Sequence, residues 1–396
     1  MKALRSFRFP AKLTLGLTAI GLLLSCILIP WTRAHEHPHF RARTPVRIPD
    51  IPGYRTLKCD FHIHTIFSDG KVWPDIRAEE AWREGLDVIA ITDHLEYQPH
   101  KADVSTNHNR SYEIAKPYGD NLKLTVIKGS EITRKMPPGH FNAIFLTNST
   151  PLAVDDWHDA FKEAKRQGAF IFWNHPGWEG QQADGVARWY KEHTELYDQG
   201  FMNGVEVVNA RDYYPEAHKW CIEKNLTMMS NSDIHSPLNL DYEVHEGDHR
   251  PLTLVFATDA GPAAVKEALF AHRTAVYSAN RLVGSEEFLK PIFLASVKPL
   301  SDEVRIKGKG SALIQIQNNS DIDYELEITG KVEGVTLPKE LVLAAGKTVL
   351  LQVTGTGKAN PGTQQVRIPI QVKNLLVAPN EPLKLSAPLR IEFVAP

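Results

Sequence analysis

The chain has 396 residues, of which 42% are hydrophobic, and its formal net charge is −2. This length and apolar content allow more than one domain with its own core. The net charge is close to zero, and the body of the chain contains no Lys/Arg-rich run, which argues against extended nucleic acid as a partner. A small charged ligand is compatible with this charge.

The N-terminus has the features of an export signal. Basic residues precede the apolar run LTLGLTAIGLLLSCILIPW, and TRA offers a small-residue cleavage site at Ala34, so residues 1–34 are predicted to be a signal peptide or a membrane anchor. A lipoprotein signal ending at Cys26 is an alternative, and an uncleaved anchor is another because the run is nearly long enough to span a bilayer. All three predict an exported chain, periplasmic or extracellular.

Residues 35–54, HEHPHFRARTPVRIPDIPGY, are predicted to be a linker, because they are rich in Pro, Arg and His and show no periodicity. From about Leu57 short apolar runs alternate with helical stretches over residues 55–288. The expected strands are LKCDFH, DVIAIT, LKLTVIKG, FNAIFL, AFIFWN, GVEVVN and TMMSNS. Val- and Ile-rich strands separated by helices predict βαβ units, a parallel sheet and a closed, seven-stranded TIM-like barrel, with an open doubly wound sheet as the alternative.

The composition changes from about Pro291. Runs such as VRIKG, ALIQIQ, YELEIT and VRIPIQV alternate apolar and polar residues between turn residues, which predicts an antiparallel β-sandwich over residues 289–396. This segment contains no His and no Trp. We therefore expect a packing or spacer domain, with a carbohydrate- or protein-binding module as the alternative.

Potential metal ligands lie at the ends of the expected strands or just after them, except His140, which lies just before the fourth strand, and in an α/β barrel the strand ends share one mouth. They are His62, His64, Asp69, His94, Glu131, His140, His175, Asp233 and His235. Buried imidazoles and carboxylates need partners, and a mixed His and carboxylate set without a thiol suits Zn²⁺, Mn²⁺ or Fe²⁺. At three or four ligands per ion, nine candidates predict two or three divalent ions.

The motifs DFHIHTIFSDG, AITDHLEY, KGSEIT, the isolated His140, NHPGW and SNSDIH resemble, in order, the motifs of the PHP (polymerase and histidinol phosphatase) superfamily. The resemblance covers about Leu57 to Ser285. It implies a distorted seven-stranded barrel with a trinuclear metal centre that hydrolyses phosphoesters, and the predicted layout is similar to that of exported PHP-type phosphodiesterases acting on small diesters.

Three ligand sets follow from this resemblance. They are His62, His64, Glu131 and Asp233 for one metal, Glu131, His140 and His175 for a second, and Asp69, His94 and His235 for a third. Glu131 would bridge two metals, and Asp93 is interpreted as supporting a ligand or ordering a loop.

The predicted reaction is attack of a metal-bridging hydroxide on phosphorus. Expected contributors are Glu131, Asp233 and His235, with Arg211 at the mouth as a cation, and the general acid is left open among His235, Asp233 and a metal-bound water. A small phosphoester is the expected partner. Alternatives are a phosphomonoesterase of histidinol-phosphatase type, an amidohydrolase, and a non-catalytic metal-binding or adhesive surface protein.

Overall fold

The structure is a computed structural model that describes residues 42–301 and 303–395. The predicted signal or anchor, residues 1–34, lies outside the described residues, as does the first part of the predicted linker. Among the described residues no helix is both long and apolar enough to span a bilayer.

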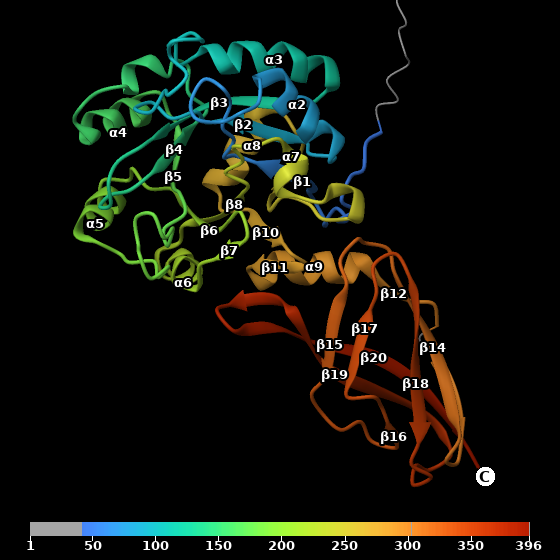
Figure 1. Cartoon of the computed structure of the whole chain (residues 1–396). Coiled ribbons are helices and arrows are strands. Elements are labelled where there is room, and N and C mark those ends of the chain that lie inside the picture. Colours follow the sequence, from blue (N-terminus) through green and yellow to red (C-terminus); the bar gives the residue numbers. More distant parts are fainter. Residues whose placement is uncertain (1–41, 302, 396) are drawn as a thin grey trace, which may run out of the picture. The chain divides into compact units, whose positions relative to one another are not determined.

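From Arg55 the chain forms an α/β core, and its strands lie where the apolar runs predict them (Figure 1). The strands are β1 (Arg55–Asp60), β2 (Val88–Ile91), β3 (Thr125–Ile132), β4 (Phe141–Ile144), β5 (Phe170–Trp173), β6 (Gly204–Asn209), β7 (Asp212–Tyr213), β8 (Thr227–Asn231), β9 (Leu252–Ala257), β10 (Thr274–Ser278) and β11 (Arg281–Gly284). The helices are α2 (Pro74–Arg83), α3 (Arg110–Leu122), α4 (Trp157–Arg166), α5 (Lys191–Asp198), α6 (Pro215–Lys224), α7 (Leu238–Asp241), α8 (Pro262–Phe270) and α9 (Glu286–Ser296), with 3-10 turns η1 (Thr150–Leu152) and η2 (Val244–Glu246). Every residue of β2, β4, β5, β6 and β9 is buried, as expected for strands covered on both faces.

The expected parallel sheet is correct for β1–β2–β3 and for β5–β6–β8, and wrong for β4. β4 is antiparallel to both β3 and β5. Only residues 133–140 connect β3 to β4, and this link contains no crossover helix, so the chain must return in the opposite direction. The start of β4 therefore lies at the same edge as the ends of its neighbours.

The closure of the barrel also differs from a regular one. β1 pairs antiparallel with β9 on the side where β8 would complete a ring. β8 pairs with β6, and the isolated parallel bridge between Ile63 and Ile234 joins the segments that follow β1 and β8. A closed count of seven strands thus stays a prediction, while the parallel-strand α/β core is confirmed.

The C-terminal part is a two-sheet β domain, as the alternating pattern predicts. Its strands are β12 (Val297–Pro299), β13 (Glu303–Lys307), β14 (Ser311–Asn318), β15 (Tyr324–Ile328), β16 (Val335–Thr336), β17 (Glu340–Leu343), β18 (Thr348–Gly355), β19 (Gly362–Ala378) and β20 (Glu381–Val394). One sheet contains β13, β20, β19, β15 and β17, and the other has the order β12-β14-β18-β16. The pairing is antiparallel except between β13 and β20 and between β11 and β19.

Helix α9 continues past Pro291, where the sequence suggests that helical structure stops, and it contains the predicted boundary at residues 288/289. A proline inside a helix removes a hydrogen bond, but burial of an apolar face can outweigh that loss. Leu289, Ile292 and Phe293 of α9 are buried and supply that face.

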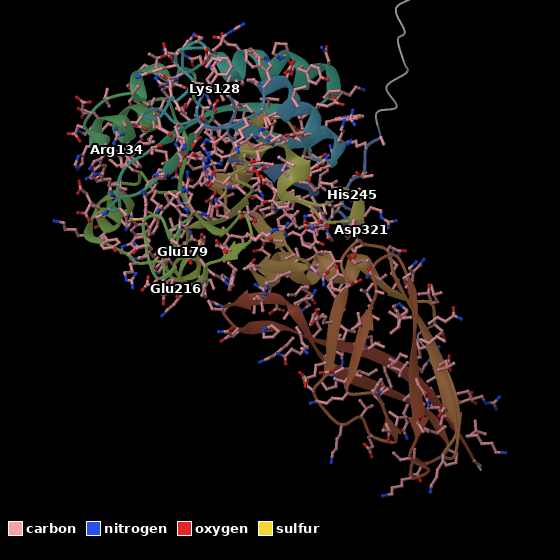
Figure 2. All side chains as sticks on the ribbon, in the orientation of Figure 1. Lys128, Arg134, Glu179, Glu216, His245 and Asp321 are labelled. Atoms are coloured by element: carbon pink, nitrogen blue, oxygen red, sulfur yellow. The ribbon has the colours of Figure 1, made fainter. Side chains whose placement is uncertain are left out.

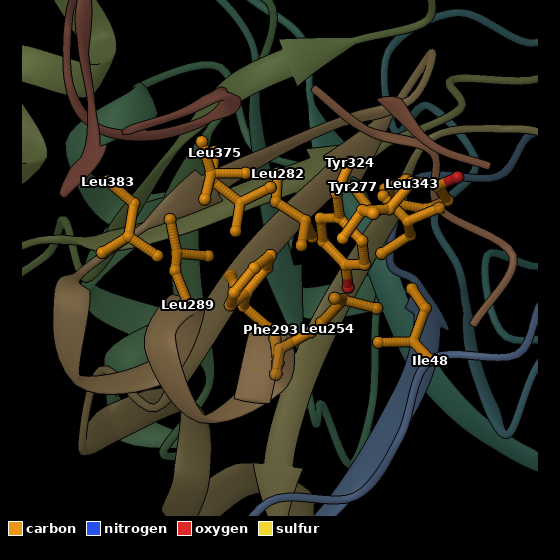
Figure 3. Packing of buried hydrophobic residues seen from close by; sticks show 14 of the residues in the cluster. Ile48, Leu254, Tyr277, Leu282, Leu289, Phe293, Tyr324, Leu343, Leu375 and Leu383 are labelled. Atoms are coloured by element: carbon orange, nitrogen blue, oxygen red, sulfur yellow. The ribbon is translucent and has the colours of Figure 1, made fainter. Parts of the chain in front are cut away.

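The α/β core and the sandwich share apolar packing. Leu254 and Leu282 belong to the same buried cluster as Tyr324 and Leu383 of the sandwich (Figure 3). β19 pairs with β11, and Figure 1 shows β19 and β20 extending from the sandwich to this strand. The sandwich sheet is therefore a continuation of the core sheet.

The described part of the predicted linker packs on this body. Ile48 and Ile51 are buried. The guanidinium of Arg47 donates to the carboxylate of Asp321, which is labelled in Figure 2, with a shortest N–O distance of 2.5 Å. Residues 43–54 are thus bound to both parts of the body rather than forming a free linker.

Candidate metal centre

All nine predicted ligands converge at one end of the α/β core, in three groups with ligand atoms within 4.8 Å of one another inside each group. In the first group, Oδ1 of Asp233 lies 3.1 Å from Nε2 of His62 and 3.0 Å from Nε2 of His64. Oε2 of Glu131 lies 3.6 Å and 3.4 Å from the same two nitrogens. Ligand atoms around a tetrahedral ion with bonds of about 2.1 Å lie about 3.4 Å apart, so these atoms are spaced to hold one ion.

The second group contains Glu131, His140 and His175. Oε1 of Glu131 lies 2.8 Å from Nδ1 of His140 and 3.7 Å from Nε2 of His175. The two oxygens of Glu131 therefore face different groups, which is the arrangement that a bridging carboxylate requires.

The third group consists of His64, Asp69, His94 and His235. Oδ1 of Asp69 lies 3.1 Å from Nε2 of His235 and 3.5 Å from Nε2 of His94. The side chains of His235 and Asp69 are 35% and 26% exposed, whereas His62 and His64 are fully buried. The third group therefore contains the two most exposed of the nine ligands.

Orphaned acceptors show that this site fits metal ions. Oδ1 of Asp69 and Oε2 of Glu131 are buried, and although imidazole nitrogens lie 3.1 Å and 2.8 Å from them, no group donates to either oxygen in hydrogen-bond geometry. Such atoms are costly to bury unless a cation satisfies them. Imidazole and carboxylate donors without a thiol suit Zn²⁺, Mn²⁺ or Fe²⁺.

The charges at the centre also depend on one another. Burial lowers the pKa of His62, but the carboxylates of Asp233 and Glu206 outweigh burial and hold this pKa well above its usual value. Burial raises the pKa of Asp233, but His62 and His64 outweigh it and hold this pKa well below the usual range. Burial also lowers the pKa of His94, but the carboxylates of Glu131 and Asp69 outweigh burial and raise this pKa to about 11. A metal ion would replace protons at these imidazoles.

A buried carboxylate that the sequence analysis did not identify orients His62. Glu206, in β6, accepts from Nδ1 of His62 through Oε1 at 2.9 Å, which leaves Nε2 facing the first group. It also accepts from Nδ2 of Asn231, from Nδ2 of Asn209 and from the backbone N–H of His175. In the sequence, Glu206 could be recognised only as an acidic residue inside the mostly apolar strand GVEVVN.

The loop that carries Asp69 is fixed by Asp93, in agreement with the loop-ordering role proposed for this acid. Its Oδ1 accepts from the backbone N–H of Thr65 and from Oγ of Ser68, both at 2.7 Å. Since these donors lie between His64 and Asp69, Asp93 determines where the two ligands lie relative to each other.

A second supporting residue that the sequence analysis did not identify is Arg77, which is fully buried in α2. Its guanidinium donates to the carbonyl oxygens of His64, Ile234 and Ser236. It therefore ties the segment after β1 to the segment after β8, where Ile63 and Ile234 form their bridge. Nothing in the charge-rich sequence of α2 distinguishes this arginine from its exposed neighbours.

Two of the ligands have an unusual backbone. The φ angles of His175 and Asp233 are +28° and +53°, in the left-handed region that non-glycine residues rarely adopt. Backbone hydrogen bonds hold both residues in place, from His175 N–H to Glu206 and from Asp233 N–H to the carbonyl oxygen of His62. Such strain is concentrated at functional sites.

Arg211, expected at the mouth as a cation, is engaged by a carboxylate, and so are Arg134 and Arg250. Arg211 contacts Asp248 at 2.6 Å and donates to the carbonyl oxygen of Asp241. Arg134 pairs with Glu96. Arg250 is fully buried and binds Asp60 and Glu84, so it does not lie at the mouth. The structure thus brings the nine predicted ligands together. The guanidinium of Arg211 is paired with Asp248 instead of being directed at the ligands.

Comparison with known proteins identifies the family of the chain. A family model described as an Ig-like domain matches residues 297–388. The crystal structure of a two-domain protein from Bacteroides vulgatus ATCC 8482, containing a predicted PHP-like metal-dependent phosphoesterase, is 44% identical, with a TM-score of 0.83 over 88% of this chain and 99% of that chain. The chain belongs to the PHP-like metal-dependent phosphoesterases and carries a C-terminal Ig-like domain.

Two other solved structures match less of the chain. A metal-dependent phosphoesterase candidate from Bifidobacterium adolescentis ATCC 15703 is 16% identical over 47% of this chain and 89% of that chain, with a TM-score of 0.36. An amidohydrolase from Chromobacterium violaceum is 15% identical over 45% of this chain and 88% of that chain, with a TM-score of 0.33. No curated protein matches the chain.

Proposed function

We propose that the protein hydrolyses small phosphodiesters at a centre of up to three divalent metal ions. The observation that carries the proposal is the arrangement of Glu131, whose two oxygens face two ligand groups. His64 belongs to both the first and the third group, so the three groups form one continuous centre. When bound, divalent ions would supply a hydroxide at neutral pH and neutralise charge on the phosphoryl oxygens.

The residues of the chain orient and hold these ions. Glu206 directs Nε2 of His62 into the centre. Asp93 holds the loop between His64 and Asp69. The pKa of His235 is raised, because Asp69 and Asp233 outweigh its burial, and its side chain is 35% exposed. His235 is therefore a candidate for protonating the leaving oxygen if it is not bound to a metal.

The charge balance favours a diester over a monoester. A monoester carries up to two negative charges at neutral pH and would gain from guanidinium groups beside the metals. Arg134, Arg211 and Arg250 are instead occupied by carboxylates. A diester carries a single negative charge and needs fewer cations.

The proposal is tested by comparing turnover of bis(p-nitrophenyl) phosphate and p-nitrophenyl phosphate after chelation and reloading with Mn²⁺ or Zn²⁺. We expect the reloaded protein to prefer the diester. Glu223→Gln, a change of an exposed carboxylate on α6, is a control that should keep wild-type turnover. A strong preference for the monoester would overturn the diester assignment, and no turnover of either ester by metal-loaded protein would overturn the enzymatic one.

We also propose that this activity takes place outside the cytoplasm, on the basis of the basic and apolar N-terminal sequence. Full-length protein with Met1 intact in the soluble cytoplasm would contradict this.

A further inference from the structure

An exposed aromatic ring lies beside the metal centre. The indole of Trp178 is 5.8 Å from the imidazole of His140 and 5.3 Å from that of His175, measured between ring centroids. Both imidazoles belong to the second ligand group, yet Trp178 is 46% exposed. A second ring, that of Tyr97, is 52% exposed and lies 6.1 Å from His94. The centre thus has aromatic surface open to solvent at its rim.

The position of the indole depends on a glycine. A Cβ added to Gly180 would lie 2.4 Å from Cζ2 of Trp178 and 2.6 Å from Cη2, so the ring lies directly against the backbone of Gly180. A turn joins His175 to Trp178, and the backbone N–H of Trp178 closes it by donating to the carbonyl oxygen of His175 at 2.9 Å. The φ angle of Gly180 lies outside the left-handed region, so the backbone conformation does not require glycine here. The close contact with the indole does, because any Cβ would overlap the ring. The ring therefore lies against the backbone of Gly180 as well as beside the imidazoles of His140 and His175, and these neighbours limit the orientations that it can adopt.

We propose that Trp178 is a stacking platform that selects phosphoesters carrying a planar aromatic group, a nucleobase or an aryl ring. This inference rests on the proposed function, because the metal centre would bind the phosphate that places the planar group over the indole. An indole with limited orientations offers a π-face at little cost in conformational entropy, and base–aromatic stacking tolerates any base. The carboxylates of the centre favour no particular organic group, so Trp178 supplies the selectivity.

The test compares two product-like ligands that share a sugar phosphate. Dissociation constants of adenosine 5′-monophosphate and ribose 5-phosphate are measured by titration calorimetry on Mn²⁺-loaded protein. We expect the nucleotide to bind about tenfold more tightly, and Trp178→Ala to reduce this ratio to about twofold or less. Phenyl phosphate compared with methyl phosphate, treated in the same way, separates an aryl preference from a nucleobase preference.

Three further variants refine the test. Trp178→Phe should retain most of the ratio. Gly180→Ala should lower it without removing the indole, because the added Cβ displaces the ring. Phe270→Ala removes another exposed aromatic ring, 41% exposed at the end of α8, and should leave the ratio unchanged. Elemental analysis checks that every variant keeps its metals.

A wild-type ratio near one for both ligand pairs would overturn the inference. An unchanged ratio in Trp178→Ala would do so too, as would an equal loss of affinity for both members of a pair, which would mean that Trp178 only supports its histidines. Turnover of bis(p-nitrophenyl) phosphate tests the proposed function separately. If the protein hydrolyses the monoesters instead, the diester assignment fails, and the same ratio is then obtained from kcat/KM.

Discussion

Replacing Glu206 by Gln tests how strongly metal binding depends on the orientation of His62. The carboxylate accepts four hydrogen bonds at 2.7–2.9 Å, from His62, Asn231, Asn209 and the backbone of His175. The amide of Gln keeps one acceptor oxygen and replaces the other with a donor. Two of the four donors would therefore face an N–H group, whichever way the amide is turned.

The magnitude follows from these contacts. A buried donor left without an acceptor costs about 1–3 kcal/mol, so one or two of them, depending on how the amide is turned, predict a loss of about 1–6 kcal/mol in the free energy of unfolding. If the amide N–H faces Nδ1 of His62, the proton of this imidazole moves to Nε2, the atom that faces the first ligand group. Loss of a carboxylate that orients a ligating His typically lowers metal affinity about 10- to 100-fold.

Metal affinity would be measured by titrating chelated protein with Zn²⁺ in a competing chelator, and stability by urea unfolding of the chelated form. Glu223→Gln, the same change at an exposed position of α6, provides the control. Wild-type zinc affinity together with a loss of stability below about 1 kcal/mol in Glu206→Gln would refute the reasoning.

Three other changes probe the centre and its surroundings. Glu131→Gln should remove about one to two ions by elemental analysis and slow turnover about a thousandfold, roughly 4 kcal/mol; full metal occupancy with near-normal turnover would exclude a bridging role. Arg77→Met should lower the free energy of unfolding by about 3–5 kcal/mol, because it leaves three backbone carbonyl oxygens without the guanidinium donor and the carboxylate of Glu80 without its cation; a loss under about 1 kcal/mol in urea would contradict this. The pKa of buried His193 is lowered to about 4 by desolvation, so its contribution to stability is present above the unfolded-state pKa of about 6.5 and is lost as the pH falls. Between pH 6.5 and 5, urea unfolding should therefore show wild-type protein losing about 2 kcal/mol more than His193→Gln, and equal losses would exclude this origin.

The ligands could be found from sequence because most of them follow a recognisable apolar run and His140 immediately precedes one. The strands before His62, Glu131 and Asp233 lie where the sequence predicts them, so the potential ligands meet at one end of the core. What the sequence does not reveal is the support around them. Glu206 and Arg77 act through contacts between segments far apart in the chain, and such contacts leave no local pattern.

The direction and pairing of two strands were also beyond the sequence. β4 has the composition of its parallel neighbours, and only the short connection from β3 indicates that it runs the other way. β9 takes the edge of β1 that a regular barrel would give to β8. Edge pairing depends on competition between whole strands, which apolar periodicity does not encode.

The pairing of β19 with β11 has a consequence for how the protein can be divided. Leu282 and Val283 of β11 lie opposite Leu375 and Leu376 of β19. A chain cut near Pro291 would interrupt α9 and leave this apolar edge as an unpaired template for strand addition. The isolated catalytic half should therefore self-associate, and domain-swapping experiments need to carry the β19–β20 hairpin with the core rather than with the rest of the sandwich.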